Sequence, residues 1–343
     1  MKKLTERQKL ILTLIVHEHT RTAQPVGSKT MVDQFNLNLS PATIRNEMGA
    51  LTDMGYLRQP HTSAGRIPTE EGYRFFVSNL VQQTNLPATT RNTISHQFYQ
   101  SRQDLDQWLR LAASILANQS QAASLVTAPH SQNSLFKHLE LIATRGSQIL
   151  MVLVLVGGEI RQQILALTEP VSQERLSNIA AQISNLCQNC SAQQLDTIRP
   201  QFDQIGGQVL DLVQEEMSLS EKLVTGEVYL DGLTNVLAEP EFAEPGDARL
   251  ALRLFEERSL LDDLLTRTIM TNDEGGVQVL IGGEGTWDEL RLCSVILGRY
   301  GIPGSMTGTL GVLGPMRMPY GHTISTVRFV SGLLSDLVAE ALV

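Results

Sequence analysis

Cysteine, aromatic residues and long apolar runs are all scarce in this chain, and each shortage excludes a class of protein. The 343 residues include 3 cysteines, 5% aromatic residues and no apolar run longer than the eight residues 149–156. Three thiols do not form a disulfide framework, so we expect a reducing, cytoplasmic environment. Eight apolar residues are far fewer than the ~20 of a membrane-spanning helix, so we expect a buried strand there and no membrane partner.

The sequence also lacks the residue patterns of common catalytic and metal sites. The glycine-rich tail contains neither GxxxxGK[ST] nor GxGxxG, so its glycines indicate hairpins and bulges rather than a phosphate loop. Cys187 and Cys190 form a lone CxxC inside an expected helix, with no second pair and no nearby histidine. His17 and His19 are two residues apart rather than the four that a metal-binding helix requires. We therefore expect no enzyme, no metal and no cofactor.

Basic residues are outnumbered in the chain as a whole but not at its start. The net charge is −9, yet residues 1–80 contain 10 Lys and Arg against 7 Asp and Glu. The remainder contains 17 against 29. A slightly basic head on an acidic body favours contact between the head and a polyanion such as DNA.

Residues 39–76 are the most informative stretch, because they have the pattern of a recognition helix followed by a wing. Ser40 suits the N-cap of a helix and Pro41 its first position, where the missing N–H has no cost. Gly55 suits a left-handed stop at the other end. Apolar residues recur between them at helical spacing, namely Ile44, Met48 and Leu51. The pattern predicts one amphipathic helix with one buried face.

The opposite face of this helix has residues suited to reading DNA. Arg45 can bond guanine bidentately and Asn46 can bond adenine, while the small Ala42 and Gly49 allow close approach to base edges. Thr43 lies at the edge of this face, where it can reach a phosphate or a base edge. Two alternatives stay open: an ion pair between Arg45 and Glu47, or a helical hairpin that packs on another part of the protein.

The order of the surrounding elements favours a winged helix over residues 1–85. Residues 56–58 and 66–68 predict two short strands joined by the turn-rich tip 59–65. Four helices are expected. The first follows a capping box of Thr5 and Gln8, the second spans 28–35, the third is the recognition helix, and the fourth begins at Glu70. We expect Lys29, Arg58 and Arg66 to contact phosphates, with Arg66 a candidate for the minor groove. The candidate DNA-binding residues are Lys29, Ser40, Thr43, Arg45, Asn46, Arg58, His61 and Arg66.

The rest of the chain predicts an α+β sheet domain interrupted by helices. A polar linker over 82–91 precedes a helical region over 92–121. The expected strands are 139–143, 148–156, 160–167, 277–282, 290–297 and 309–313, with a hairpin turn at Gly157 and Gly158. The expected later helices are 173–188, 208–218, 248–266 and 330–342.

In these residues, the chain resembles the family of heat-inducible transcription repressors called HrcA. TERQKLILTLIVHEHTRTAQPVGSKTM is similar to the family's first two helices, and LSPATIRNEMGALTDMGYLRQPHTSAGRIPTEEGYRFFV to its recognition helix and wing. Late in the chain, Ile281-Gly282, Gly314-Pro315, Arg317-Met318 and Tyr320 resemble the family's tail. The helical insert departs from the family in being rich in Gln and Ala.

The resemblance implies an α+β fold of three domains, beginning with an N-terminal winged helix-turn-helix over 1–85. A GAF-like α+β domain over 86–204 and 267–343 follows, with a mainly helical dimerisation domain over 205–266 inserted into it. The resemblance also implies a repressor that binds, as a homodimer, an inverted-repeat operator of double-stranded DNA upstream of chaperone operons. It would be released on heat stress, with the chaperonin as modulator.

Two other functions remain open at this point. A winged-helix regulator could be controlled by a small ligand in the GAF-like domain, and an enzyme could carry a nucleic-acid-binding module. The dimer contact is also open. The amphipathic helices 208–218 and 248–266 are its candidates, but their apolar faces could equally pack in the core of one subunit.

Overall fold

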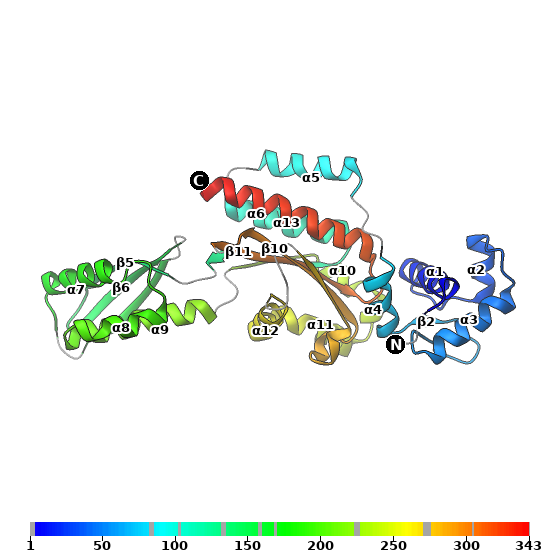
Figure 1. The fold of residues 1–343 in the computed structure, drawn as a ribbon, viewed down its shortest axis with the longest axis horizontal. Helices are drawn as coiled ribbons and strands as arrows, with labels where there is room; N and C mark the ends of the chain where they lie inside the picture. Colours follow the sequence, from blue (N-terminus) through cyan, green and yellow to red (C-terminus); the bar gives the residue numbers. More distant parts are fainter. Residues whose placement is uncertain are drawn as a thin grey trace. The chain divides into compact units, whose positions relative to one another are not determined.

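The chain divides into two compact units, which are described separately (Figure 1). Unit 1 comprises 1–127, 228–300 and 309–343, and unit 2 comprises 128–227 and 301–308. The computed structural model describes residues 4–81, 86–101, 104–131, 135–156, 160–167, 170–222, 227–269, 276–303 and 305–342. Among these residues, no helix combines the length and the apolar character needed to span a membrane.

Unit 1 begins with the predicted winged helix. Its elements are α1 (Glu6–Thr22), α2 (Ser28–Phe35), α3 (Pro41–Asp53), β1 (Leu57–Arg58), β2 (Ile67–Pro68) and α4 (Glu70–Asn79). The predicted caps are confirmed: Thr5 and Gln8 form a capping box, and the Ser40 hydroxyl accepts from the Thr43 amide at 3.1 Å. Gly55 has the predicted left-handed backbone, with a φ of 84°. The apolar stripe of α3 is buried against the other helices.

The wing is held to the start of α2 by a third piece of extended chain. Leu57 pairs with Pro68 and Arg58 with Ile67, as two antiparallel strands. The Val26 amide donates to the Arg66 carbonyl at 2.9 Å, and the Arg66 amide donates back to the Val26 carbonyl at 2.9 Å. Gly65 lies so close to Val26 that a Cβ atom there would overlap the Val26 carbonyl. A glycine is therefore required at this crossing.

The body of unit 1 is an antiparallel sheet covered by helices. The strand order is β8-β3-β11-β10-β9, and β4 pairs with β11 off this path. The strands of the main path are β3 (Ala123–Thr127), β8 (Val228–Asp231), β9 (Val277–Ile281), β10 (Cys293–Ile302) and β11 (Met306–Pro315). The short strand β4 (His130–Ser131) belongs to unit 2 by its residues and pairs with the first residues of β11. The helices are α5 (Ala88–Gln100), α6 (Leu105–Ser120), α10 (Leu233–Leu237), α11 (Pro245–Glu256), α12 (Arg258–Ile269) and α13 (Tyr320–Leu342). In Figure 1, α6 and α13 run side by side along one face of this sheet, and α11 and α12 lie on the opposite side.

Unit 2 is a three-stranded meander packed against three helices. Its elements are β5 (Phe136–Ala143), β6 (Gln148–Leu155), β7 (Ile160–Ala166), α7 (Gln173–Leu186), α8 (Ala192–Ile198) and α9 (Gln204–Lys222). These strands confirm the three predicted strands, whereas the hairpin turn predicted at Gly157 and Gly158 lies outside the described residues. Cys187 is the C-cap of α7 and Cys190 follows it, so the prediction that the CxxC lies inside a helix is wrong. Burial raises the pKa of the Cys187 thiol to about 11, which makes it unreactive.

The structure also corrects several predicted elements. Residues 248–266 form two helices, because Glu257 between α11 and α12 is extended. The helical region 92–121 is likewise divided into α5 and α6, and α13 begins at Tyr320, ten residues before its predicted start at 330. Strand β10 begins at Cys293, because residues 288–290 form a short 3-10 helix.

The helices that were expected to form a dimer contact bury their apolar faces within the chain. Val209, Val213 and Met217 of α9 are buried in the core of unit 2. Leu254 of α11 and Leu265 of α12 are buried in unit 1. This burial favours the alternative that the apolar faces pack in the core of one subunit, and a dimer contact through these helices stays a prediction. The compact units also have other bounds than the predicted ranges 86–204, 205–266 and 267–343, because α9 belongs to unit 2 and both α11 and α12 to unit 1.

Candidate nucleic-acid interface

Helix α3 separates its residues into a buried face and an exposed face. Ile44 and Leu51 are fully buried, whereas Arg45 and Asn46 are exposed. Glu47 does not pair with Arg45; its carboxylate accepts from the Arg7 guanidinium at 3.4 Å and from the Gln8 amide at 3.1 Å, both on α1. The alternative pairing of Arg45 with Glu47 is therefore absent, and both predicted base-reading side chains face solvent.

The N-terminus of α3 is organised by two hydroxyl groups. The oxygen of Ser40 caps the Thr43 amide, and the hydroxyl oxygens of Ser40 and Thr43 lie 2.9 Å apart. Ser40 is exposed and Thr43 is half-buried. Free amides and the positive end of the helix dipole attract anions at such a terminus. The geometry therefore places these two predicted residues where a phosphate can approach the start of α3.

A basic hollow of about 480 Å³ lies between α2, α3 and the wing. It brings together three of the predicted residues, Lys29 from α2, Arg45 from α3 and Arg66 from the wing. None of the described residues that line this hollow is acidic. Walls of one charge sign concentrate the electric field of a cleft, so the charge of this hollow suits an anion such as a phosphate.

The predicted DNA-binding residues of the wing differ from one another in how exposed they are. Arg66 is partly buried, and its Nε donates to the Thr52 hydroxyl of α3 at 3.1 Å. Its guanidinium is thus anchored beside the recognition helix rather than at the wing tip. Arg58 on β1 and His61 at the tip are both exposed. The tip itself is held by Gln59, whose amide nitrogen donates to the carbonyls of Thr62 at 2.9 Å and Ala64 at 3.0 Å.

The hollow also includes polar residues that the sequence did not single out. These are Ser28, Gln59, Thr62 and Ser63. The sequence pattern predicted a turn-rich tip, but it did not predict that the tip folds back toward α2. The short bridge between Val26 and Arg66 brings these segments together, and it joins residues 40 positions apart.

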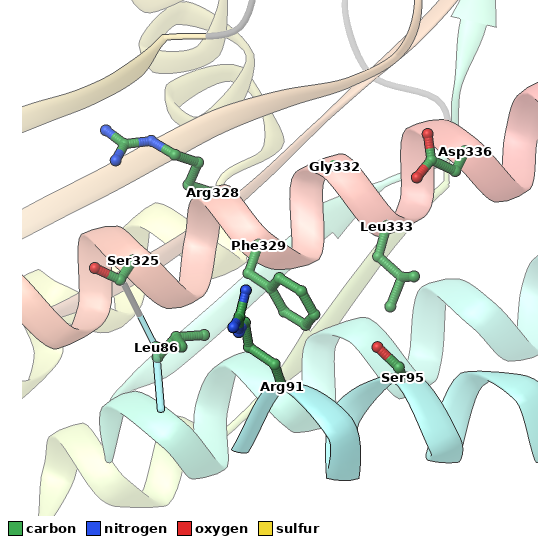
Figure 2. Close-up of a pocket in the computed structure, with 9 residues that line it drawn as sticks. All are labelled: Leu86, Arg91, Ser95, Ser325, Arg328, Phe329, Gly332, Leu333 and Asp336. Carbon is green, nitrogen blue, oxygen red and sulfur yellow. The ribbon is translucent and has the colours of Figure 1, made fainter. Parts of the chain in front are cut away.

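A second candidate site is a groove of about 380 Å³ between α5 and α13 in unit 1. Figure 2 shows Arg91, from α5, pointing toward Phe329 on α13. Leu86, Phe329 and Leu333 make an apolar wall, and Arg91 and Arg328 are exposed cations at the groove. The residues Ser95, Ser325, Gly332 and Asp336 complete the lining. Such a combination suits a small molecule with an apolar body and an anionic group.

Comparisons with known proteins cover most of the chain. The family model described as HrcA protein C terminal domain matches residues 106–324, and the LexA DNA binding domain model matches residues 1–65. The chain is 44% identical to the heat-inducible transcription repressor HrcA of Roseiflexus castenholzii, over 98% of this chain and 95% of the relative. It is 41% identical to the repressor of the same name from Herpetosiphon aurantiacus, over 98% and 96%. A crystal structure titled as a hypothetical protein is similar in fold, with a TM-score of 0.63, 24% identity, and coverage of 99% of this chain and 100% of that chain.

Proposed function

The chain belongs to the HrcA family of heat-inducible transcription repressors, and on that premise we propose how it binds its operator. It is a DNA-binding repressor of the heat-shock response with an N-terminal winged helix. We propose that it binds an inverted-repeat operator upstream of chaperone operons as a homodimer and releases it on heat stress. The observation that carries this proposal is the basic hollow of Lys29, Arg45 and Arg66 beside the exposed face of α3.

We propose that α3 enters the major groove with Arg45 and Asn46 toward the bases. Both side chains are exposed on the face of α3 that does not pack on the domain, which supports this role. Thr43 would contact a phosphate or a base edge. Ser40 would cap the end of α3 that approaches the same strand of the DNA. Bidentate contacts of this kind supply sequence discrimination in the major groove.

Phosphate contacts would come from the two sides of α3. Lys29 approaches from α2, whereas Arg58, His61 and Arg66 approach from the wing. Because the Arg66 guanidinium is anchored on Thr52 of α3, the phosphate that it would contact is one next to α3. These contacts would fix the register of the protein on the duplex without reading its sequence.

We propose that the second subunit is a copy of this chain that meets it through the open face of the sheet in unit 2. The side chains on the other face of this sheet are buried against helices, but Ile142, Ile160 and Ile164 are 45%, 58% and 67% exposed. By strand register, Leu150 of β6 lies between Ile142 and Ile164, and Val154 lies opposite Ile160. Aliphatic side chains lie on all three strands of this face, beside the hydrogen-bonded pair of His138 and Glu140, and a second copy related by a two-fold axis can meet the same surface.

A homodimer also follows from what operator recognition needs. One winged helix reads only a few base pairs, whereas a two-fold dimer reads two half-sites about one helical turn, or a multiple of it, apart. The inverted repeat that the family resemblance implies has this symmetry. A GAF-like assignment for the sheet of unit 1, a cytoplasmic location and modulation by the chaperonin are likewise proposals that rest on the family.

A titration of the chain against the host's chaperonin promoter tests the proposed function. We expect retarded complexes with this fragment and much weaker binding to a scrambled fragment of equal length. Light scattering on the same sample should give the mass of a dimer. Equal binding to both fragments would contradict the proposal, and addition of purified chaperonin to the reaction would test its role as modulator.

The groove between α5 and α13 favours a second candidate function, control by a small ligand. Arg91 and Arg328 beside an apolar wall suit an amphipathic anion. A thermal-shift screen with metabolites separates the two functions. A ligand that raises the melting temperature of the chain, but not of an Arg91→Ala variant, would support ligand control. An unchanged melting temperature across the screen would leave the heat-released repressor as the function.

A further inference from the structure

The winged helix in unit 1 packs on the body of the same unit through residues of the family-like tail. Arg317, Tyr320 and the pair Ile281-Gly282 stood out in the sequence without an assigned role. All of them contact α1 or α4, which are the first and last helices of the winged helix. The tail residues therefore form a docking face for the DNA-binding domain.

Arg317 is the polar centre of this docking face. Its side chain is only 11% exposed, and its Nε donates to Glu241 at 2.5 Å. A second guanidinium nitrogen donates to Glu239 and to the other oxygen of Glu241. The third nitrogen, Nη1, donates to the Thr20 carbonyl at 3.3 Å. Thr20 belongs to the last turn of α1, where carbonyls lack intrahelical partners and the helix dipole attracts cations.

Helix α4 reaches the same face beside β9. The Arg74 guanidinium donates to the Ile281 carbonyl at 3.3 Å and also pairs with Glu70. Gly282 has a φ of 65°, and a Cβ atom at this position would overlap the side chain of Glu70. A Cβ atom at this position would therefore displace the Glu70 side chain, the ion-pair partner of Arg74, from its place beside the end of β9.

Two tyrosines complete the contact. The rings of Tyr73 on α4 and Tyr320 on α13 lie 6.1 Å apart between centroids. The Tyr320 hydroxyl donates to the Met316 carbonyl at 2.7 Å and lies 2.7 Å from the Ser294 hydroxyl, so this ring is fixed to the body. The Tyr73 hydroxyl is buried and has no hydrogen-bond partner among the described residues. A buried unpaired hydroxyl is unfavourable, so the docking is specific in shape but weaker than a fully paired interface.

We propose that Arg317 and Gly282 are positioning residues for operator binding, which hold each winged helix in one orientation on its body. This inference rests on the proposed dimeric recognition of an operator. If a winged helix is free to reorient, binding of the second half-site must first order it, and whole-operator affinity falls. Affinity for one half-site does not depend on that ordering, so it stays the same.

The test compares a whole operator with a single half-site for the full-length chain and for Arg317→Met, which keeps the apolar stem but removes the charge. Arg249→Met, at an exposed arginine on α11 of the same unit, is the matched control. We expect Arg317→Met to weaken whole-operator binding at least tenfold and to leave half-site binding within twofold of the parent chain. The control should change neither value. Unchanged whole-operator affinity, or an equal loss for both DNAs, would overturn the inference.

A second set of variants keeps the test decisive if Arg317→Met does not fold. Gly282→Ala should give the same selective loss, and a further Glu70→Ala should restore binding because it removes the overlap. Gly146→Ala is the matched control, since Gly146 also has a positive φ, of 62°, but has open space around it. Failure of Glu70→Ala to restore binding would mean that local strain, not docking, caused the loss. If the parent chain itself does not prefer the whole operator, the proposed function fails, and the inference fails with it.

Discussion

Ile164 offers the most direct test of the proposed dimer contact. Its side chain is 67% exposed on the open sheet face of unit 2, in register with Leu150 of β6. An Ile164→Ala substitution removes three carbon atoms, each worth about 0.8 kcal/mol when it is buried. If contact with a second copy buries the exposed two thirds, the loss is about 1.6 kcal/mol per subunit. Both subunits carry the change, so the dimer loses about 3 kcal/mol, or about 200-fold in its dissociation constant.

The assay is sedimentation or light scattering over a dilution series, together with a thermal melt. The matched control is Leu186→Ala, because Leu186 is also in unit 2 and is 41% exposed, but it lies on α7 and not on the sheet. We expect Ile164→Ala to dissociate at much higher concentration than the parent chain, with a similar melting temperature measured on monomer. A dissociation constant unchanged from that of the control would refute the argument for this face.

Three further predictions concern the winged helix. Arg45→Ala should lower discrimination between operator and scrambled DNA by about 1–3 kcal/mol, measured as a ratio of dissociation constants, and an unchanged ratio would show that Arg45 does not read bases. Arg66→Ala should weaken both DNAs alike and reduce the slope of log K against log salt by about one, while an unchanged slope would exclude a phosphate contact. Burial lowers the pKa of His19 below its usual 6.5, so the unfolded chain binds the proton more readily. The melting temperature should therefore fall as the pH drops below 6.5, and less so in His19→Gln, whereas equal falls in both proteins would exclude His19 as the cause.

Local signals predicted the elements that depend on neighbouring residues. Helix α2 has the predicted bounds, and the Ser40 cap and the Gly55 stop are as expected, because each needs only a few consecutive residues. The first part of α13 was missed, since Thr323, Ser325 and Thr326 are poor helix formers as judged by propensity. In the fold their hydroxyls donate to carbonyls four residues earlier, and the burial of this face outweighs the low propensity.

Non-local packing set the limit of what the sequence could predict. The apolar stripes of α9 and α12 were recognised, but periodicity does not reveal which core a stripe joins. The exposed face of Arg45 and Asn46 was likewise predicted from spacing alone. The basic hollow was not, because it depends on the close crossing of Gly65 and Val26.

Hydroxyl-radical footprinting on the host's chaperonin promoter tests the central claim most directly, since it maps where the protein lies on each strand. The claim is that two copies of the α3 face, with Arg45 at its centre, read an inverted repeat. It predicts two protected patches related by two-fold symmetry, one helical turn or a multiple apart, both lost in Arg45→Ala. A single asymmetric patch, or protection that persists unchanged in Arg45→Ala, would contradict it.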